Sequence, residues 1–153
     1  MPPDDTARTA LITGIHHFGL TVGNVDASAA WYVEVLGFRR VGEFASSDGA
    51  RRKVFLRHAG LRARLGLTEH RDGASDVFDE TRVGLDHLAF EVADRAELDA
   101  WASRLATAGV VHTSVMPANS IPDAAVLVLR DPDNIQLELF FDPSDRADDD
   151  AEP

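Results

Sequence analysis

Two histidines and one glutamate are the side chains of this chain with the clearest potential for chemistry. His17 and His87 occupy the same position in two similar segments, residues 15–22 (IHHFGLTV) and 85–92 (LDHLAFEV). Both segments alternate apolar and less apolar residues, as half-buried strands do. Glu138 lies between two leucines in a third alternating segment. Two imidazoles and one carboxylate form the ligand set that holds Fe, Mn, Ni, Co or Zn with coordination positions left open.

Strand parity predicts that these three side chains share the concave face of a sheet. The alternate residues form apolar stripes that we expect to lie under helices: Phe18, Leu20 and Val22; Leu88, Phe90 and Val92; Ile135, Leu137 and Leu139. A single strand histidine is more often an ordinary packed or surface residue. Here the histidine is repeated, and a glutamate inside a sheet needs a partner for its charge. Both observations favour one divalent metal ion per site.

Four further side chains share the predicted concave face. Thr21, Gln136 and Phe140 are candidates to line a substrate. Glu91 is the candidate general base, and Glu138 could move a proton as well as bind the metal. Each could equally be ordinary sheet surface.

The elements that position these residues are duplicated along the chain. Each histidine strand precedes a predicted helix, 27–36 or 95–108, with an aspartate suited to the N-cap (Asp26, Asp94) and a terminating glycine (Gly37, Gly109). Three more strands are predicted in each half: 38–45, 52–57 and 62–69, then 110–115, 125–129 and 135–140. The turn 131–134 (DPDN) lets Asn134 take a positive φ.

This order predicts an α+β fold of two βαβββ modules that form a cup-shaped, partly open mixed sheet with flanking helices. We expect one domain over residues 14–141, with modules 14–69 and 84–141 joined by a polar linker, 70–83. Residues 1–13 and the acidic segment 142–153 are expected to be a disordered extension and tail. Neither module has enough core to be secure alone, so the two should pack together or pair with a second chain.

The repeat also predicts what the site lacks. Aligning residues 64–68 with 136–140 places Gly66 opposite Glu138, so only three protein ligands are expected. His16 belongs by parity to the helix side, and we interpret it as a strand-edge residue. The other histidines (His58, His70 and His112) are expected in solvated turns, where any of them could still act as an acid or base.

Composition narrows the classes of partner. The net charge is −11, and six of the acids lie in residues 142–153. Such a surface repels phosphate backbones and anionic lipid, so nucleic acid and membrane are excluded as expected partners. No cysteine is present, which excludes disulfides, thiolate sites and cysteine nucleophiles. The chain has no apolar run of the roughly 20 residues that span a bilayer and no secretory signal, so a cytoplasmic location is expected.

Four segments together (15–22, 30–38, 84–92 and 131–140) resemble the vicinal oxygen chelate superfamily, also called the glyoxalase/bleomycin resistance/dioxygenase family. The resemblance implies paired βαβββ modules, commonly a homodimer, and sometimes metal ligands contributed across the subunit interface. Its metal positions fall on His17, His87 and Glu138. It implies a metal-dependent lyase, isomerase or dioxygenase acting on a small organic substrate that chelates the metal through adjacent oxygens.

Departures from the pattern separate the branches of this family. Gly66 stands where glyoxalase I-like isomerases use a carboxylate, which disfavours hemithioacetal isomerisation. Extradiol dioxygenases are often twice as long and place a tyrosine and a histidine beside iron, whereas Tyr32 falls in a predicted helix. A strongly cationic loop of the fosfomycin-type thiol transferases is missing. The alternative function is that of a non-catalytic, bleomycin-resistance-like binding dimer, although proteins of that branch lack the three metal ligands. A third hypothesis is a purely structural dimerisation module.

Overall fold

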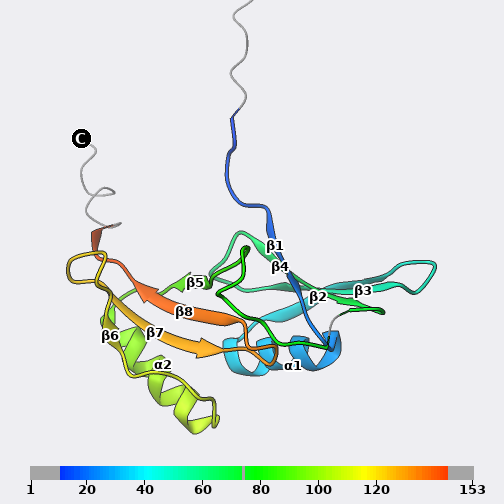
Figure 1. Ribbon diagram of the computed structural model, residues 1–153. Helices are drawn as coiled ribbons and strands as arrows, with labels where there is room; N and C mark the ends of the chain where they lie inside the picture. The colour runs from blue at the N-terminus through cyan, green and yellow to red at the C-terminus, as the bar shows by residue number, and fades with distance from the viewer. Residues whose placement is uncertain (1–10, 74, 145–153) are drawn as a thin grey trace, which may run out of the picture.

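A computed structural model describes residues 11–73 and 75–144, which form two βαβββ modules (Figure 1). The first contains β1 (His17–Thr21), α1 (Val25–Leu36), β2 (Arg39–Ala45), β3 (Arg51–Arg57) and β4 (Arg64–His70). The second contains β5 (Leu88–Glu91), α2 (Arg95–Thr107), β6 (Met116–Pro117), β7 (Ala125–Arg130) and β8 (Gln136–Phe141). The predicted α+β fold of two modules is confirmed. Most of the predicted extension and tail lies outside the described residues.

Each module forms its own four-stranded mixed sheet, in the orders β1-β4-β3-β2 and β5-β8-β7-β6. In both sheets the first strand runs parallel to the last, and the remaining pairs are antiparallel. The register reproduces the sequence repeat, because Gly19 pairs with Gly66 as Ala89 pairs with Glu138. Gly66 is therefore the structural counterpart of Glu138, as the alignment predicts.

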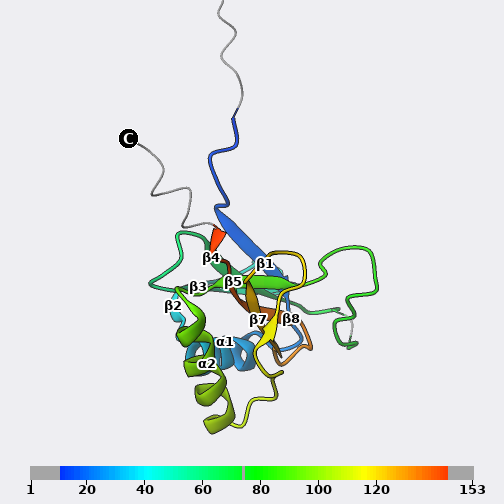
Figure 2. The same ribbon diagram turned by 90° about the vertical axis from the view of Figure 1, so that its left-hand side faces the viewer.

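Both helices lie on one side of the two sheets and leave the opposite faces uncovered (Figures 1 and 2). The apolar stripes predicted from parity lie on the helix side: Leu20 and Leu137, for example, are buried, whereas His17 and His87 are exposed. The uncovered surface of each sheet is called its open face below. In the described part of the chain, neither helix is long and apolar enough to cross a bilayer.

Helix α1 begins two residues earlier than predicted. Its N-cap is Asn24, whose side chain accepts a hydrogen bond from the Ala27 amide at 2.9 Å, so the prediction of Asp26 as the cap is wrong. Asp26 lies in the first turn and pairs with Arg52 at 3.0 Å and Arg40 at 3.4 Å. A carboxylate is favourable there because the first turn presents unpaired amides. The predicted cap at Asp94 is confirmed.

The strand predicted over residues 110–115 does not form. His112 makes an isolated bridge to Leu129, and the short β6 follows at Met116. The Thr113 hydroxyl accepts a hydrogen bond from the Val128 amide at 3.0 Å. In a regular pair of strands, this amide would donate to a backbone carbonyl instead. A side chain that competes for ladder hydrogen bonds in this way interrupts the strand.

A buried carboxylate joins the two modules. Asp131, in the β7–β8 turn, accepts a hydrogen bond from the Tyr32 hydroxyl of α1 at 2.9 Å. It also accepts the amides of Asp133 at 2.9 Å and Ile135 at 2.8 Å. Burial raises the pKa of Asp131, and these three donors oppose the shift because they stabilise the charged carboxylate. Asp133 adds a second link by accepting the Ser28 hydroxyl at 2.9 Å.

We expect Tyr32→Phe to weaken this junction without changing the packing of the ring. Loss of one donor to a buried carboxylate should lower the free energy of unfolding by about 1.5–3 kcal/mol, measured by urea denaturation. Ser103→Ala, on the exposed side of α2, is the control and should stay within about 0.5 kcal/mol of wild type. Equal stability of the two variants would contradict the role of the Tyr32–Asp131 bond.

Candidate functional site

His87 and Glu138 lie together on the open face of the second sheet. The His87 Nε2 atom is 3.7 Å from the Glu138 Oε2 atom. His87 directly precedes β5, and Glu138 lies within the neighbouring strand β8, where it pairs with Ala89. Two ligands that each lie about 2.1 Å from one ion at right angles are about 3 Å apart, so a small adjustment fits a shared metal. The pair is accessible, because the side chains of His87 and Glu138 are 40% and 15% exposed.

Asp86 orients the imidazole of His87. The Asp86 carboxylate lies 2.5 Å from the Nδ1 atom of His87. This contact, assisted by the nearby Glu138 charge, raises the pKa of His87. In the neutral imidazole, a proton held on Nδ1 by Asp86 leaves the Nε2 atom, which faces Glu138, able to bind a metal, as around metal-bound histidines.

His17 repeats this arrangement on the open face of the first sheet. The Nδ1 atoms of His16 and His17 lie 2.8 Å apart, so one ring donates to the other. In both modules the residue before the histidine therefore contacts Nδ1 rather than Nε2. Sequence reasoning missed this role of His16 and Asp86, although their equivalent positions in the repeat carried the signal.

Within one chain, His17 does not join the other two candidates. The described residues 11–73 and 75–144 contain no group of three His, Asp, Glu or Cys side chains close enough to share an ion. The predicted set is thus divided into the His87–Glu138 pair on the second sheet and His17 on the first. A three-ligand centre would need a second copy of the chain to supply the missing part.

A chain of polar contacts supports Glu138 from its other side. The Gln136 amide donates to Glu138 Oε1 at 3.4 Å and accepts from Arg130 at 3.0 Å. Arg130 in turn binds both carboxylate oxygens of Glu80, at 2.6 and 2.9 Å. Gln136, predicted to line a substrate, therefore also positions the predicted ligand Glu138 and ties it to the linker.

The remaining predicted site residues lie at different distances from this pair. Phe140 is half-buried on β8 and pairs in register with Glu91, which is exposed. Glu91 borders an apolar cavity of about 100 Å³ between the modules. The histidines expected in solvated turns lie elsewhere: His58 and His112 are half-buried, and His70 is exposed but is the last residue of β4, which corrects that expectation.

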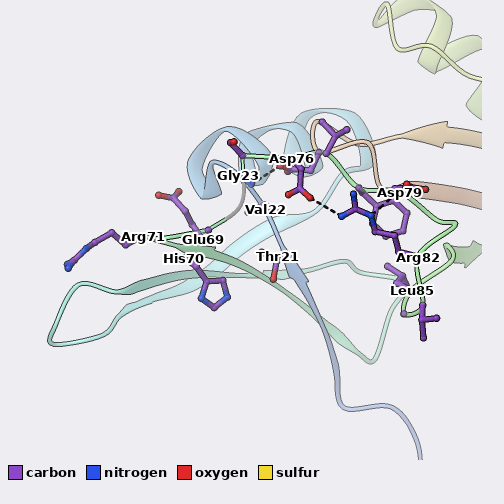
Figure 3. A pocket seen from close by; sticks show the side chains of 17 residues that line it. Thr21, Val22, Gly23, Glu69, His70, Arg71, Asp76, Asp79, Arg82 and Leu85 are labelled. Atoms are coloured by element: carbon purple, nitrogen blue, oxygen red, sulfur yellow. Dashed lines mark hydrogen bonds and ion pairs between the residues drawn. The ribbon is translucent and has the colours of Figure 1, made fainter.

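Thr21 lies at a separate hollow of about 480 Å³ beside the linker (Figure 3). The acids of this hollow already have partners. Asp76 and Asp79 pair with Arg82, at 3.0 and 3.8 Å, and Glu69 accepts the Val25 amide at 2.8 Å. These interactions explain why the hollow is a poor candidate for metal binding.

Comparison with known proteins identifies the family. Residues 14–139 match the model of the Glyoxalase/Bleomycin resistance protein/Dioxygenase superfamily. This match covers most of the chain and includes all three ligand candidates. The chain belongs to this superfamily.

Two relatives illustrate the range within the superfamily. A solved glyoxylase/bleomycin resistance protein/dioxygenase domain from Frankia sp. EAN1pec is 35% identical, with a TM-score of 0.77, and the match covers 86% of this chain and 99% of that one. A biphenyl-2,3-diol 1,2-dioxygenase from Sphingomonas paucimobilis is 31% identical over 134 residues, which are 86% of this chain but 40% of the enzyme. The chain thus spans about two fifths of that enzyme's length.

Another solved structure shares the fold alone. The fosfomycin resistance protein FosX from Listeria monocytogenes, solved with Mn(II), is 18% identical with a TM-score of 0.61, and the match covers 84% of this chain and 92% of that one. Proteins similar to this chain thus include a dioxygenase and, by fold alone, a fosfomycin resistance protein solved with Mn(II).

The ion pair behind Glu138 gives a pH-dependent prediction. Arg130 lowers the pKa of Glu80 from 4.5 to about 2. Because the folded pKa is depressed, the stability from this pair is present above the ordinary pKa and is lost as the pH falls toward 2. We expect Arg130→Gln to return the Glu80 pKa toward 4.5, as measured by NMR titration of the side-chain carboxyl.

Arg82→Gln is the matched control, because Arg82 pairs with Asp76 and Asp79 rather than with Glu80. The Glu80 pKa should remain at about 2 in that variant. An equal change in both variants would contradict the specific Arg130–Glu80 pair.

Proposed function

We propose that the chain is a divalent-metal-dependent enzyme whose site is shared between two copies of the chain. His87 and Glu138 of one copy and His17 of the other would hold the ion. The observation that carries the proposal is the His87–Glu138 pair, 3.7 Å apart and oriented by Asp86, together with an equally oriented His17 on the equivalent strand. Within the described residues, the three side chains of one chain do not lie close enough together to share an ion.

The donor set fits a divalent transition metal. Two neutral imidazole nitrogens and one carboxylate oxygen suit Fe(II), Mn(II), Ni(II), Co(II) or Zn(II) better than Ca²⁺, which takes oxygen ligands. Gly66 occupies the position that would hold a fourth ligand, and it has no side chain to offer. Three protein ligands leave coordination positions for substrate oxygens. When bound, such an ion acts as a Lewis acid for two adjacent oxygens of a small organic molecule.

The chain's own residues would orient the substrate and move protons. Asp86 keeps His87 in the tautomer that can bind metal, and Gln136 holds the Glu138 carboxylate at 3.4 Å. Glu91 is exposed on the same open face, two residues along β5 from Ala89, the partner of Glu138. It is our candidate general base. Phe140 lies between β5 and β7 and offers an apolar ring to the substrate. A lyase, isomerase or dioxygenase reaction is compatible with these groups.

The shared site is testable by mixing variants. His17→Ala and Glu138→Ala should each lose the metal, measured by elemental analysis of purified protein. In a heterodimer of the two variants, one site carries both changes and the other carries neither. Because of this symmetry, the heterodimer should regain about half of the wild-type metal content per chain.

Each result of the mixing experiment has a distinct meaning. A heterodimer that stays free of metal, when wild type contains it, would place the site within one chain and reject the shared arrangement. Wild type that holds no metal but binds a planar drug would favour the non-catalytic binding dimer. Wild type that binds neither would leave a structural dimerisation module.

The role of Asp86 gives a second prediction. Removing the group that orients a metal-bound histidine typically lowers metal affinity by about 10–100-fold. We expect that loss for Asp86→Ala, measured by competition with a chelating dye. Asp99→Ala, on the exposed side of α2, removes the same charge elsewhere and should leave the affinity unchanged. Equal affinities of the two variants would refute the orienting role.

A further inference from the structure

The open face of the first sheet carries a row of arginines that ends at His17. Arg39 pairs with Arg57 between β2 and β3, and Arg64 pairs with His17 between β4 and β1. The last pair of β3 and β4 is Leu56 with Leu65, and the next residues of these antiparallel strands, Arg57 and Arg64, lie side by side. Paired residues project to the same face, so three guanidinium groups follow one another across the sheet.

None of these arginines is neutralised by an acid in residues 11–73 and 75–144. Every ion pair of that part of the chain involves other cations. The acids of β1–β4 are Glu43 and Glu69, and both lie on the helix side, opposite Val54 and Arg52. A chain with a net charge of −11 thus leaves one sheet face without a single strand carboxylate.

The helix side of the same sheet shows the contrast. There Arg40 and Arg52 both pair with Asp26 of α1, at 3.4 and 3.0 Å. Like charges side by side on a sheet are destabilising when they have no partner. The chain neutralises its arginines on the covered side and leaves them unpaired on the open side, where a ligand could reach them.

The arginines also border a concave surface. Arg57, Arg62 and Arg64 line a hollow of about 480 Å³, together with residues 13–16. No acid is among the residues that line it. Guanidinium groups bind carboxylates through two parallel hydrogen bonds, which is stronger and more specific than a single contact.

An aromatic side chain, Phe55, lies beside this row of arginines. Phe55 is half-buried on the open face between Gly42 and Gly66, its partners on β2 and β4. A Cβ atom added to Gly66 would lie 3.8 Å from the Phe55 ring, and one added to Gly42 would lie 3.9 Å from it. Because neither glycine has a side chain, the ring remains open to a flat group. Two residues along β3, about 6.6 Å, separate Phe55 from Arg57.

We propose that this face binds a planar organic carboxylate, with Arg57 and Arg64 on the carboxylate and the Phe55 ring against the flat body. The spacing suits an anion of the size of benzoate. Since His17 ends the same row, the anion would be part of the substrate of the proposed metal enzyme. In this respect the inference rests on the proposed function, but the binding itself needs no metal.

The test compares two molecules of equal shape and different charge. Metal-free, chelator-treated protein is titrated with benzoate and with benzamide, followed by amide NMR shifts. Wild type should bind benzoate at least about tenfold more tightly, the ratio expected for one charge-assisted bidentate contact. Equal binding of the two molecules would overturn the proposal.

Variants locate the binding. Arg64→Gln and the double variant Arg57→Gln/Arg64→Gln should reduce or abolish the preference for benzoate. Arg52→Gln, on the same strand as Arg57 but on the helix side, should keep it. Arg64 is exposed, so its substitution leaves the core intact, and the amide spectrum verifies the fold. A preference that survives the double variant would refute the assignment to this row.

A comparison with inorganic phosphate and the variant Phe55→Leu test whether the ligand has a planar body that contacts the Phe55 ring. Benzoate should bind several-fold more tightly than phosphate, and Phe55→Leu should weaken benzoate without affecting phosphate. Equal binding of the two anions, unchanged by Phe55→Leu, would overturn a planar ligand. These measurements use protein without metal, so their failure is separate from loss of metal in the Glu138→Ala variant.

Discussion

Asp131 is the residue on which the geometry of the second module depends, because one carboxylate there fixes both a turn and a junction. Its Oδ1 atom accepts the amides of Asp133 and Ile135, which shapes the turn that starts β8 at Gln136. Its Oδ2 atom accepts the Tyr32 hydroxyl and so joins the turn to α1 of the first module. Glu138 lies one step farther along the open face than Gln136. The hydrogen bonds to Asp131 therefore shape the turn from which β8 carries Glu138 toward His87.

The two modules share one backbone plan and have divided the chemistry between them. Equivalent positions carry Gly66 and Glu138, and likewise Arg64 and Gln136. The first sheet thus presents a histidine with unpaired arginines, and the second presents a histidine with a glutamate. The first open face lacks the glutamate ligand, and the second lacks the unpaired arginines. A site that used both open faces would combine these two kinds of module, which is why we propose a site shared between two copies.

Charge distribution follows the same division. Although the chain is strongly acidic overall, its open first sheet is cationic, and Arg130 in the second sheet is bound to Glu80. A net charge therefore says little about a site, because fields are set by the few charges within a Debye length of it. The acidic composition makes polyanionic partners unexpected, but it is compatible with a small anion bound on one face.

Alternation along single strands was enough to predict much of this protein. The period of two placed His17, His87 and Glu138 on the open faces, and the duplicated pattern predicted both modules and the lack of a ligand at Gly66. Such features are local, so the sequence by itself determined them. Interactions between distant segments required the tertiary structure: Asp26 pairs with Arg40 and Arg52 instead of capping α1, and the Thr113 hydroxyl accepts the Val128 amide. Only the fold showed that His87 meets Glu138 while His17 stays apart, because that separation depends on how two sheets pack and no strand pattern records it.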